Sequence, residues 1–495
     1  MTTTTYDTTR WQADIGLEIH CQLRTRTRLF SPGPLPATTD AAPNSLLTPF
    51  DLGLPGTLPR LNTRAVDLAL VAGIALECDI ALLSHFDRKH YLYPDLPKGY
   101  QLTQQERPIC QKGRIRFEHE GQPHTLPLQR IHLEEDAGRS LHDALPGHTL
   151  VDLNRAGTPL IEIVTAPALH CPLATESALR ALHRLMVWLN VCDGNLQEGS
   201  MRFDANISVR PAGSEEPGVR CELKNLNSFR FVREALTFEI DRHITLLQKG
   251  QTIRSQTRAY DDRARQTLLL RERDALPDYR FLRDPDLPPL VLDEARIARL
   301  RATHPEHPDA LERRLATTFN LPPTIARTLA ESLARATFFE DATAEFPPDL
   351  SDEARNARAQ ACANLLINTL LALLDADHPE LSALAITPAQ LASIATLLAT
   401  GELSATVAST LCEEVARTGD DPLRIVEARA LRQCRDPELL GGLVDAVIAD
   451  HPDQRDAYRR GKTQLLGFFI GQAMRRAKVE PDPRLLTSIF RERLS

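Results

Sequence analysis

The sequence predicts an α+β protein, in which an N-terminal domain built on an antiparallel sheet precedes two all-helical domains. Over the first ~290 residues, apolar and polar residues alternate with period two in several segments, which is typical of half-buried strands. A proline-rich segment at 277–290 follows, and beyond it the sequence is rich in Ala, Leu, Arg and Glu with little strand pattern. We therefore predict domains at 1–293, 294–405 and 406–495.

Four segments alternate most clearly, at 13–23, 130–136, 201–209 and 220–225. One face of each is apolar, as expected for antiparallel strands that pack on a core and face water on the other side. An ordinary wet face carries scattered Lys, Arg, Glu and Thr, whereas these faces concentrate groups that handle metal ions and phosphate. Their polar side chains are Glu18, His20, Gln22, His132, Glu134, Arg202, Asp204, Asn206, Ser208, Arg220, Glu222 and Lys224.

Three helices are well marked. Apolar residues at helical spacing predict a helix over 174–191. A second helix begins at Ser228, a good N-cap residue, and stops at Gly250. A third begins with the capping sequence TPAQ at 387–390 and ends at Gly401.

The stretch HLEEDAGRS at 132–140 places three carboxylates in a row, Glu134, Glu135 and Asp136. Adjacent like charges suit either a solvated turn or a cation that needs oxygen ligands. Strand alternation puts Glu135 opposite Glu134, so Glu135 joins a site on the polar face only if the strand ends before it. The stretch by itself leaves both interpretations open, but for Asp136 we favour the solvated turn.

Composition limits the class of protein. The 495 residues carry a net charge of −8, so nucleic acid could be bound only through local basic patches. The nine cysteines include no CxxC pair, which indicates reduced thiols. The N-terminus lacks the pattern of a signal peptide, and the apolar run at 364–374 is too short to span a bilayer. We expect a cytoplasmic protein without membrane contact.

Only seven of the 58 basic residues are lysines, and Lys89, Lys98 and Lys224 fall in the motifs described below. A lysine retained among arginines can present a compact charge to phosphate, although chance retention is an alternative for any one of them. No Walker loop, GxGxxG after a strand, HExxH or GxSxG occurs in the sequence. ATP would therefore have to bind through a different fold.

Seven segments occur in order over residues 16–232: GLEIHCQL, LGLPGTLPRLN, FDRKHYLYPDLPKGYQLTQ, HLEEDAGR, DLNRAGTPLIEIV, LQEGSMRFDANISVR and ELKNLNSFRFV. Together they closely resemble the B subunits of the aspartyl/glutamyl-tRNA(Asn/Gln) amidotransferase family. TRAYDD at 257–262 and the C-terminal segment LLGFFIGQAMRRAK extend the resemblance over nearly the whole chain.

The resemblance implies a cradle-like catalytic domain, a helical domain and a helical tail that binds tRNA. It implies ATP and Mg²⁺ as cofactors, and phosphorylation of the side-chain carboxylate of mischarged Glu-tRNA(Gln) or Asp-tRNA(Asn). Ammonia from a partner, the amidase or A subunit, then replaces the phosphate, and a heterotrimer is completed by a small third or C subunit. The sequence does not decide between the two tRNAs.

The resemblance also implies a set of metal ligands, namely Glu18, His20, Glu135, Asp204 and Glu222. Lys89 and Lys98 are the implied catalytic lysines, binding phosphate or lining the mouth of the ammonia tunnel. Glu134 is implied to align ammonia or relay a proton, and Lys224 to support the nucleotide site.

One feature departs from the family. Many relatives carry four zinc-binding cysteines where this sequence has Ser31, Gly33, Thr48 and Asp51. Without thiolates we predict no structural zinc, and we expect the loop at 31–50, rich in Pro, Ala and Thr, to be mobile.

Two other functions fit parts of the sequence. A nucleic-acid-binding scaffold with a decayed catalytic site should have lost the carboxylates and lysines, which are present. A free-standing metal-dependent ligase or kinase acting on a small carboxylate would not need a tail that resembles a tRNA-binding domain. Competition by uncharged tRNA would separate this last function from a tRNA-dependent one.

Overall fold

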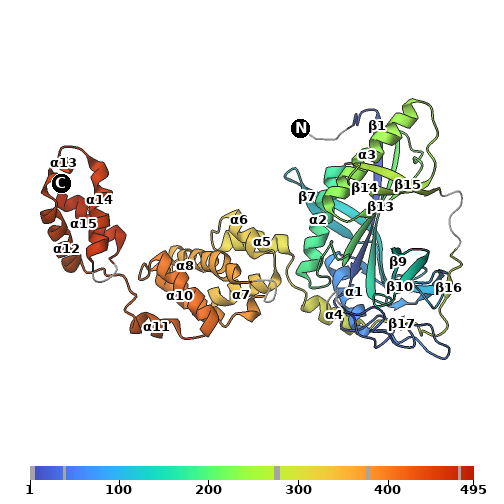
Figure 1. The fold of residues 1–495 in the computed structure, drawn as a ribbon, viewed down its shortest axis with the longest axis horizontal. Coiled ribbons are helices and arrows are strands. Elements are labelled where there is room, and N and C mark those ends of the chain that lie inside the picture. Colours follow the sequence, from blue (N-terminus) through green and yellow to red (C-terminus); the bar gives the residue numbers. More distant parts are fainter. Residues whose placement is uncertain (1–5, 37–40, 273–278, 375–379, 478–480, 495) are drawn as a thin grey trace. The chain divides into compact units, whose positions relative to one another are not determined.

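The computed structural model describes residues 6–36, 41–272, 279–374, 380–477 and 481–494 (Figure 1). Residue contacts divide the chain into two units, Met1–His307 and Pro308–Ser495. The first unit contains all the named strands, and the named elements of the second are helices and short 3-10 or π turns. This arrangement confirms the predicted α+β class.

A ten-stranded sheet forms the centre of the first unit. Its strands follow the order β15-β14-β13-β12-β1-β11-β8-β6-β2, and β7 also pairs with β8. The long strands β1, β12, β11 and β8 therefore lie side by side in the middle of the sheet. The bounds are β1 Trp11–Gln22, β2 Asp79–Ile80, β6 Cys110–Gln111, β7 Arg114–His119, β8 Gln122–Glu135, β11 Pro159–Thr165, β12 Met201–Pro211, β13 Cys221–Leu226, β14 Gln256–Asp261 and β15 Gln266–Glu272.

The sheet is mixed, which corrects the expectation of an antiparallel one. Strands β13 and β14 run parallel, while the other pairs in this sheet are antiparallel. The reason is the helix α3 (Phe229–Gln248), which lies between them in the chain. Parallel strands need a long crossover, and a helix of this length supplies it.

The predicted alternation is confirmed on the apolar face. In β1, Ile15, Leu17, Ile19 and Cys21 are all buried. The polar face is not the open, wet surface that we expected, since His132, Glu134 and Glu222 are only 3%, 4% and 7% exposed. Charged groups this deeply buried must be paired.

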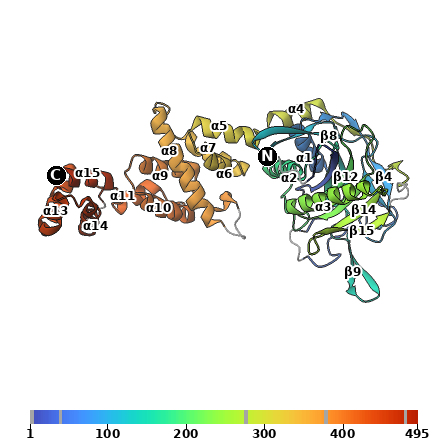
Figure 2. The same ribbon diagram turned by 90° about the horizontal axis from the view of Figure 1, so that it is seen from above.

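Helices α2 (Pro172–Trp188) and α3 pack against each other and contact the sheet at β7 and β12. Ser228 caps α3 as predicted, accepting a hydrogen bond from the backbone N–H of Phe231 at 3.1 Å. Figure 2 shows α3 lying along the sheet and the β9–β10 hairpin projecting from the first unit. That hairpin consists of Arg139–Leu145 and His148–Asp152.

The two predicted catalytic lysines lie in and next to a small three-stranded sheet. It has the order β16-β4-β5, with β4 Asp87–His90, β5 Tyr100–Thr103 and β16 Leu282–Arg283. Lys89 lies on β4, and Lys98 lies in the loop before β5. The proline-rich segment, whose residues 277–278 lie outside the described part, returns to this unit through β16 and through β17 (Leu290–Val291), which pairs with β3 (Leu83–Ser84).

The predicted domain boundaries at 293/294 and 405/406 each fall at the start of a helix that packs on a helix of the preceding segment. Helix α4 (Glu294–Ala302) packs on α1 (Thr63–Ala75) in the first unit, where Arg296 pairs with Asp67 at 2.7 Å. Helix α10 packs on α9, whose predicted capping box between Thr387 and Gln390 is confirmed. The helices of the second unit are α5 Pro308–Thr318, α6 Pro323–Leu329, α7 Leu333–Ala344, α8 Asp352–Leu365, α9 Pro388–Ala399, α10 Ala405–Thr418, α11 Pro422–Ala428, α12 Pro437–Asp450, α13 Pro452–Arg459, α14 Leu466–Arg476 and α15 Pro483–Leu494.

The last helices have a core of their own, centred on Val444, Phe469, Leu486 and Phe490. Among the residues that the structure describes, no helix is both long and apolar enough to cross a membrane.

Glu239, on α3, is fully buried and should be a major source of stability. Burial opposes its ionisation, but hydrogen bonds from His243 and Arg242 outweigh this and lower the pKa of Glu239 to about 2. Glu239→Gln should therefore reduce the free energy of unfolding at pH 7 by about 3 kcal/mol, because Arg242 and Arg258 lose their buried partner.

The pH dependence of this effect has a definite sign. The folded-state pKa lies below the ordinary 4.5, so the contribution is complete above pH 4.5 and is lost as the pH falls toward 2. Urea unfolding at pH 7 and at pH 4 should show a smaller difference between Glu239→Gln and wild type at the lower pH. An equal difference at both would contradict this account.

Candidate active site on the central strands

Strand register brings the predicted polar residues onto one face of the sheet. In the β1–β12 pair, Glu18 lies opposite Asp204 and His20 opposite Arg202. On the other side of β1, His20 lies opposite Glu162, which in turn lies opposite His132. Because directly opposed residues in antiparallel strands share a face, these side chains form rows across the sheet.

The first group on this face consists of three carboxylates and a lysine. Oxygen atoms of Glu18, Asp204 and Glu222 all lie within 4.8 Å of one another. Lys224 Nζ donates to Asp204 Oδ2 at 2.6 Å and lies 3.3 Å from Glu222 Oε1. Asn206 Nδ2 donates to Glu18 Oε1 at 3.0 Å. We call Glu18, Asp204 and Glu222 the carboxylate cluster.

The carboxylate cluster has more negative charge than Lys224 neutralises. Burial, followed by the negative charge of Glu162, raises the pKa of Glu18, and Asp204 and Glu222 raise it further. A divalent cation would remove this repulsion, and hard carboxylate oxygens are the ligands that Mg²⁺ prefers. The donor set therefore fits the predicted magnesium ion.

The second group, which we call the histidine cluster, consists of His20, His132, Glu134 and Glu162. His20 Nε2 lies 3.4 Å from Glu134 Oε1 and 3.5 Å from Glu162 Oε2. His132 Nε2 lies 3.6 Å from Glu134 Oε2 and 3.3 Å from Glu162 Oε2. Two imidazoles and two carboxylates thus alternate within a buried network.

The charges of the histidine cluster are mutually dependent. Burial alone would lower the pKa of His20, but its hydrogen bonds with Glu134 and Glu162 raise it to about 10. Bonds from His132 and His20 likewise overcome burial and lower the pKa of Glu134 to about 2. At neutral pH His20 is therefore protonated and Glu134 ionised, and the charges of Glu162 and Glu134 also raise the pKa of His132 against its burial.

Glu135 does not join either cluster. Strand β8 continues through it, so its side chain points to the opposite face from Glu134. There Lys98 Nζ donates to both of its oxygens, to Oε2 at 2.7 Å, and the backbone N–H of Leu102 donates to Oε1 at 2.9 Å. Both side chains of this pair are almost completely buried.

Of the five predicted metal ligands, the structure thus brings together Glu18, Asp204 and Glu222. His20 lies in the neighbouring histidine cluster and Glu135 on the other face. Lys89 lies on β4, with Nζ 4.8 Å from the centre of the Tyr279 ring.

The interpretation of Asp136 as a solvated turn is wrong. Asp136 is buried, and its Oδ2 accepts a hydrogen bond from Arg202 at 3.0 Å. Its backbone N–H donates to Thr158 O at 2.9 Å, which fixes the end of β8. Strand β8 ends here inside the protein, and the carboxylate is paired with Arg202.

Sequence reasoning missed Glu162 as a site residue. It is the single acid within LIEIV, an apolar run on β11. Counting in twos along this strand would have placed Glu162 on the face opposite Ile161 and Ile163, but that count does not reveal which strands are its neighbours.

A cavity of about 620 Å³ adjoins the carboxylate cluster. Glu18 and Asn206 form part of its wall, and three guanidinium groups, those of Arg130, Arg210 and Arg220, form another part. Asp14 and Glu215 line the cavity as well, and Asp14 pairs with Arg210 at 2.6 Å. A lining that combines carboxylates and arginines suits a ligand that carries phosphate and a cation.

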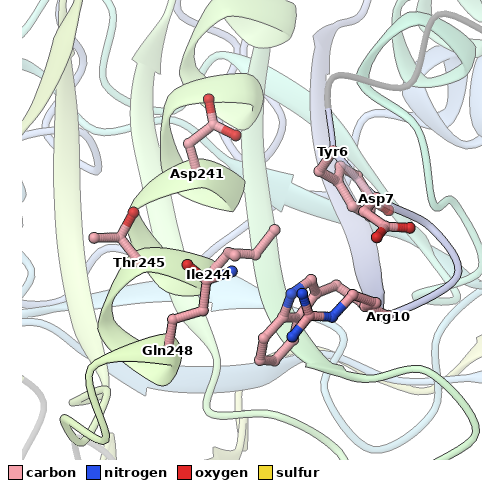
Figure 3. Close-up of a pocket in the computed structure, with 8 residues that line it drawn as sticks. Tyr6, Asp7, Arg10, Asp241, Ile244, Thr245 and Gln248 are labelled. Carbon is pink, nitrogen blue, oxygen red and sulfur yellow. The ribbon is translucent and has the colours of Figure 1, made fainter.

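A smaller pocket of about 280 Å³ lies elsewhere, between α3 and the N-terminal segment (Figure 3). Asp241, Thr245 and Gln248 on α3 face Tyr6 and the loop that follows it. None of the predicted site residues lines this pocket.

The four positions discussed for zinc lie together in the structure. Asp51 Oδ1 accepts a hydrogen bond from Ser31 Oγ, and Oδ2 accepts one from Thr48 Oγ1, both at 2.8 Å. A Cβ atom at Gly33 would lie 3.0 Å from Asp51 Oδ2. Arg28 Nε, 3.3 Å from the same oxygen, neutralises the carboxylate. This donor set does not fit zinc, which prefers thiolate and imidazole.

These bonds fix both ends of the loop that we expected to be mobile. Residues 37–40, at its centre, lie outside the described part of the chain.

Comparison with known proteins assigns the family. Residues 13–298 match the GatB/GatE catalytic domain, and residues 349–494 match the GatB domain. The chain is 42% identical over 486 residues to the B subunit of the aspartyl/glutamyl-tRNA(Asn/Gln) amidotransferase of Halorhodospira halophila, covering 98% of this chain and 99% of the relative. The chain belongs to the family of amidotransferase B subunits.

Other family members give the same result. The B subunit of Herminiimonas arsenicoxydans is 41% identical over 494 residues, 98% of this chain and all of the relative. That of Thermosynechococcus vestitus is 40% identical over 496 residues, 98% of this chain and 97% of the relative. In this member of the amidotransferase family, the carboxylate and histidine clusters both lie in the part matched to the catalytic domain.

Proposed function

We propose that this chain is the catalytic subunit of a tRNA-dependent amidotransferase that uses ATP and Mg²⁺. It phosphorylates the side-chain carboxylate of mischarged Glu-tRNA(Gln), Asp-tRNA(Asn) or both, and then replaces the phosphate with ammonia. A carboxylate is a poor electrophile toward ammonia, whereas an acyl phosphate has a good leaving group. The observation that carries the proposal is the carboxylate cluster beside an arginine-lined cavity.

We assign Glu18, Asp204 and Glu222 as the residues that hold Mg²⁺. Bound there, the ion supplies charge neutralisation for the phosphate oxygens during transfer. Lys224 keeps Asp204 and Glu222 in place through its two contacts. Phosphoryl transfer depends mainly on positioning and electrostatics, so a rigid, pre-formed cluster on neighbouring strands is well suited to it.

The cavity beside the cluster is our candidate for the nucleotide site. Arg130, Arg210 and Arg220 line it and offer donors that match phosphate geometry. Asp14 restrains Arg210, accepting a hydrogen bond from its Nε at 2.6 Å.

The histidine cluster is our candidate for proton handling. His20 Nε2 lies 3.4 Å from Glu134 Oε1, where the ionised carboxylate can accept its proton. Glu162 of the same cluster acts electrostatically on Glu18, so the histidine and carboxylate clusters are neighbours. When ammonium becomes ammonia or a tetrahedral intermediate collapses, a proton must move, and this network can accept and deliver one.

Lys98 and Glu135 are assigned to the ammonia side of the reaction. They form a buried ion pair on the face of β8 opposite the histidine cluster, separated from it by the strand itself. Lys89 lies on β4, which pairs with β5, the strand that follows the Lys98 loop. We keep it as a candidate for contact with substrate.

Ammonia comes from a companion amidase in this proposal, because this sequence lacks the Gly/Ser-rich nucleophile segment of an amidase. A small third protein would complete the complex, and the helical tail would hold the tRNA. Large apolar side chains are exposed around the Lys98 loop, a surface suited to a partner. They are Leu52, Leu54, Tyr91, Leu92, Tyr93, Phe281 and Leu282.

Leu92, which is 88% exposed, offers a test of this surface. Leu92→Asp should weaken association with the companion amidase about 30-fold, because a charge would be buried in an apolar interface. Glutamine-dependent amidation should fall while amidation with ammonium chloride is unchanged. Leu269→Asp, at a leucine of β15 that is 49% exposed, is the matched control. Unaltered association would rule out Leu92 as part of the interface.

The decisive assay supplies mischarged tRNA, ATP, Mg²⁺ and ammonium chloride, with and without the companion proteins. Formation of an activated aminoacyl ester followed by the amide supports the proposal, and running both tRNAs decides the specificity. If a small carboxylate is amidated and uncharged tRNA does not compete, the free-standing ligase is correct. If tRNA binds but ATP is not consumed, the decayed scaffold is correct.

A further inference from the structure

Arg28, a completely buried arginine, connects its own loop to two other loops near Lys98. The first contains residues 46–53 and the second residues 153–158. The side chain of Arg28 is 0% exposed and Asp51 is its ionic partner. Its Nη2 donates to Leu46 O at 3.1 Å and to Asn154 O at 2.9 Å. A buried guanidinium is stable only when its donors are paired, so these contacts fix the loops relative to one another.

The first of these loops contacts Lys98 at two places. The Phe50 ring, next to Asp51 in the chain, has its centre 4.5 Å from Lys98 Nζ. The backbone of Gly53 is so close that a Cβ atom there would lie 3.1 Å from Lys98 N and from Pro97 C. Gly53 also has a φ of +65°, so glycine is required for both reasons.

The second loop contacts the end of β8. The backbone N–H of Gly157 donates to Asp136 O at 2.8 Å, and Asp136 N donates to Thr158 O at 2.9 Å. A Cβ atom at Gly157 would be 3.5 Å from Arg28 Cδ. Arg28 and Asp51 thus connect the loop that contacts Lys98 with the loop that contacts Asp136, the residue after Glu135.

We propose that the Arg28–Asp51 ion pair is a positioning element for Lys98, acting through the Phe50 ring and the Gly53 backbone. This inference rests on the proposed role of Lys98. A lysine side chain has many rotamers, and its ammonium group is useful only if it is held in one place. Displacement of a reacting group by 1 Å can lower a rate by about 100-fold. A Phe50 ring that keeps the Lys98 ammonium group in one position should therefore have a measurable effect on kcat.

The test uses the full-length chain in its amidotransferase complex, with ammonium chloride as nitrogen source. Asp51→Asn removes the ion pair, and Phe50→Leu removes the ring while keeping an apolar side chain. Each should lower kcat about tenfold and leave KM for tRNA and ATP unchanged. The double variant should be no slower than the slower single variant, because both act through Lys98. Asp79→Asn, in the exposed pair with Lys112, is the matched control and should have wild-type kcat.

The possible outcomes are distinguishable. A lower melting temperature for Asp51→Asn, with wild-type kcat per folded molecule for both variants, would show that the pair only stabilises the fold and would overturn the proposal. If Asp51→Asn does not fold, Phe50→Leu and Arg28→Lys decide by the same kcat measurement. If Lys98→Ala is itself fully active, the proposed function of Lys98 fails, whatever these variants do.

Discussion

Lys98→Ala is expected to abolish amidation, lowering kcat by at least about 100-fold, the scale seen when one preorganised donor is removed from an active site. It should also destabilise the protein by about 3 kcal/mol, because Glu135 would be left as an unpaired buried charge. Binding of tRNA should persist. Amide formation with ammonium chloride, thermal unfolding and a tRNA binding assay measure the three quantities separately.

A charge-neutral pair of substitutions separates catalysis from folding. Lys98→Met combined with Glu135→Gln removes both buried charges, so stability should return toward wild type while amidation remains absent. Glu135→Gln by itself should also abolish amidation. Lys112→Ala, at a lysine that is 80% exposed, is the control and should be fully active. A stable, active double variant would mean that Lys98 and Glu135 serve only the fold.

Glu222→Gln is expected to be the most damaging change in the carboxylate cluster. Glu222 lies beside Lys224 and accepts a hydrogen bond from Thr257 Oγ1 at 2.7 Å, so its position is fixed from two sides. Loss of one metal ligand should raise the Mg²⁺ concentration needed for half-maximal ATP-dependent activation about 100-fold. Binding of Mn²⁺, followed by electron paramagnetic resonance, should weaken in parallel.

The control for this prediction is Glu77→Gln. Glu77 is a carboxylate of the same unit that pairs with Arg114 and Arg116 on the surface. Its replacement should change neither Mg²⁺ dependence nor Mn²⁺ binding. If Glu222→Gln binds Mn²⁺ as wild type does, the carboxylate cluster is not the metal site.

Much of the fold follows from local pattern. Alternation in ADIGLEIHCQL predicted which residues of β1 are buried, since side chains of a strand point to opposite faces in turn. Ser228 and the Thr387–Gln390 box predicted two helix starts, since capping depends on residues a few positions apart. Each of these features is determined within about ten residues of chain.

The composition of the site did not follow from local pattern alone. HLEEDAGRS leaves open whether β8 stops before Glu135, and that single position decides whether Glu135 faces the histidine cluster or Lys98. A shift of one residue in a strand exchanges its two faces. The same limitation concealed Glu162, whose importance depends on His20 and His132 in the strands on either side.

The sequence by itself determined the fold class, the strands with a charged face and the family to which the chain belongs. Only the tertiary structure decided that Glu18, Asp204 and Glu222 form one group, that Glu135 pairs with Lys98, and that Asp136 is buried. The physical reason is that periodicity is a property of one strand, whereas a site is made by the order and register of several strands, which contacts between distant segments determine.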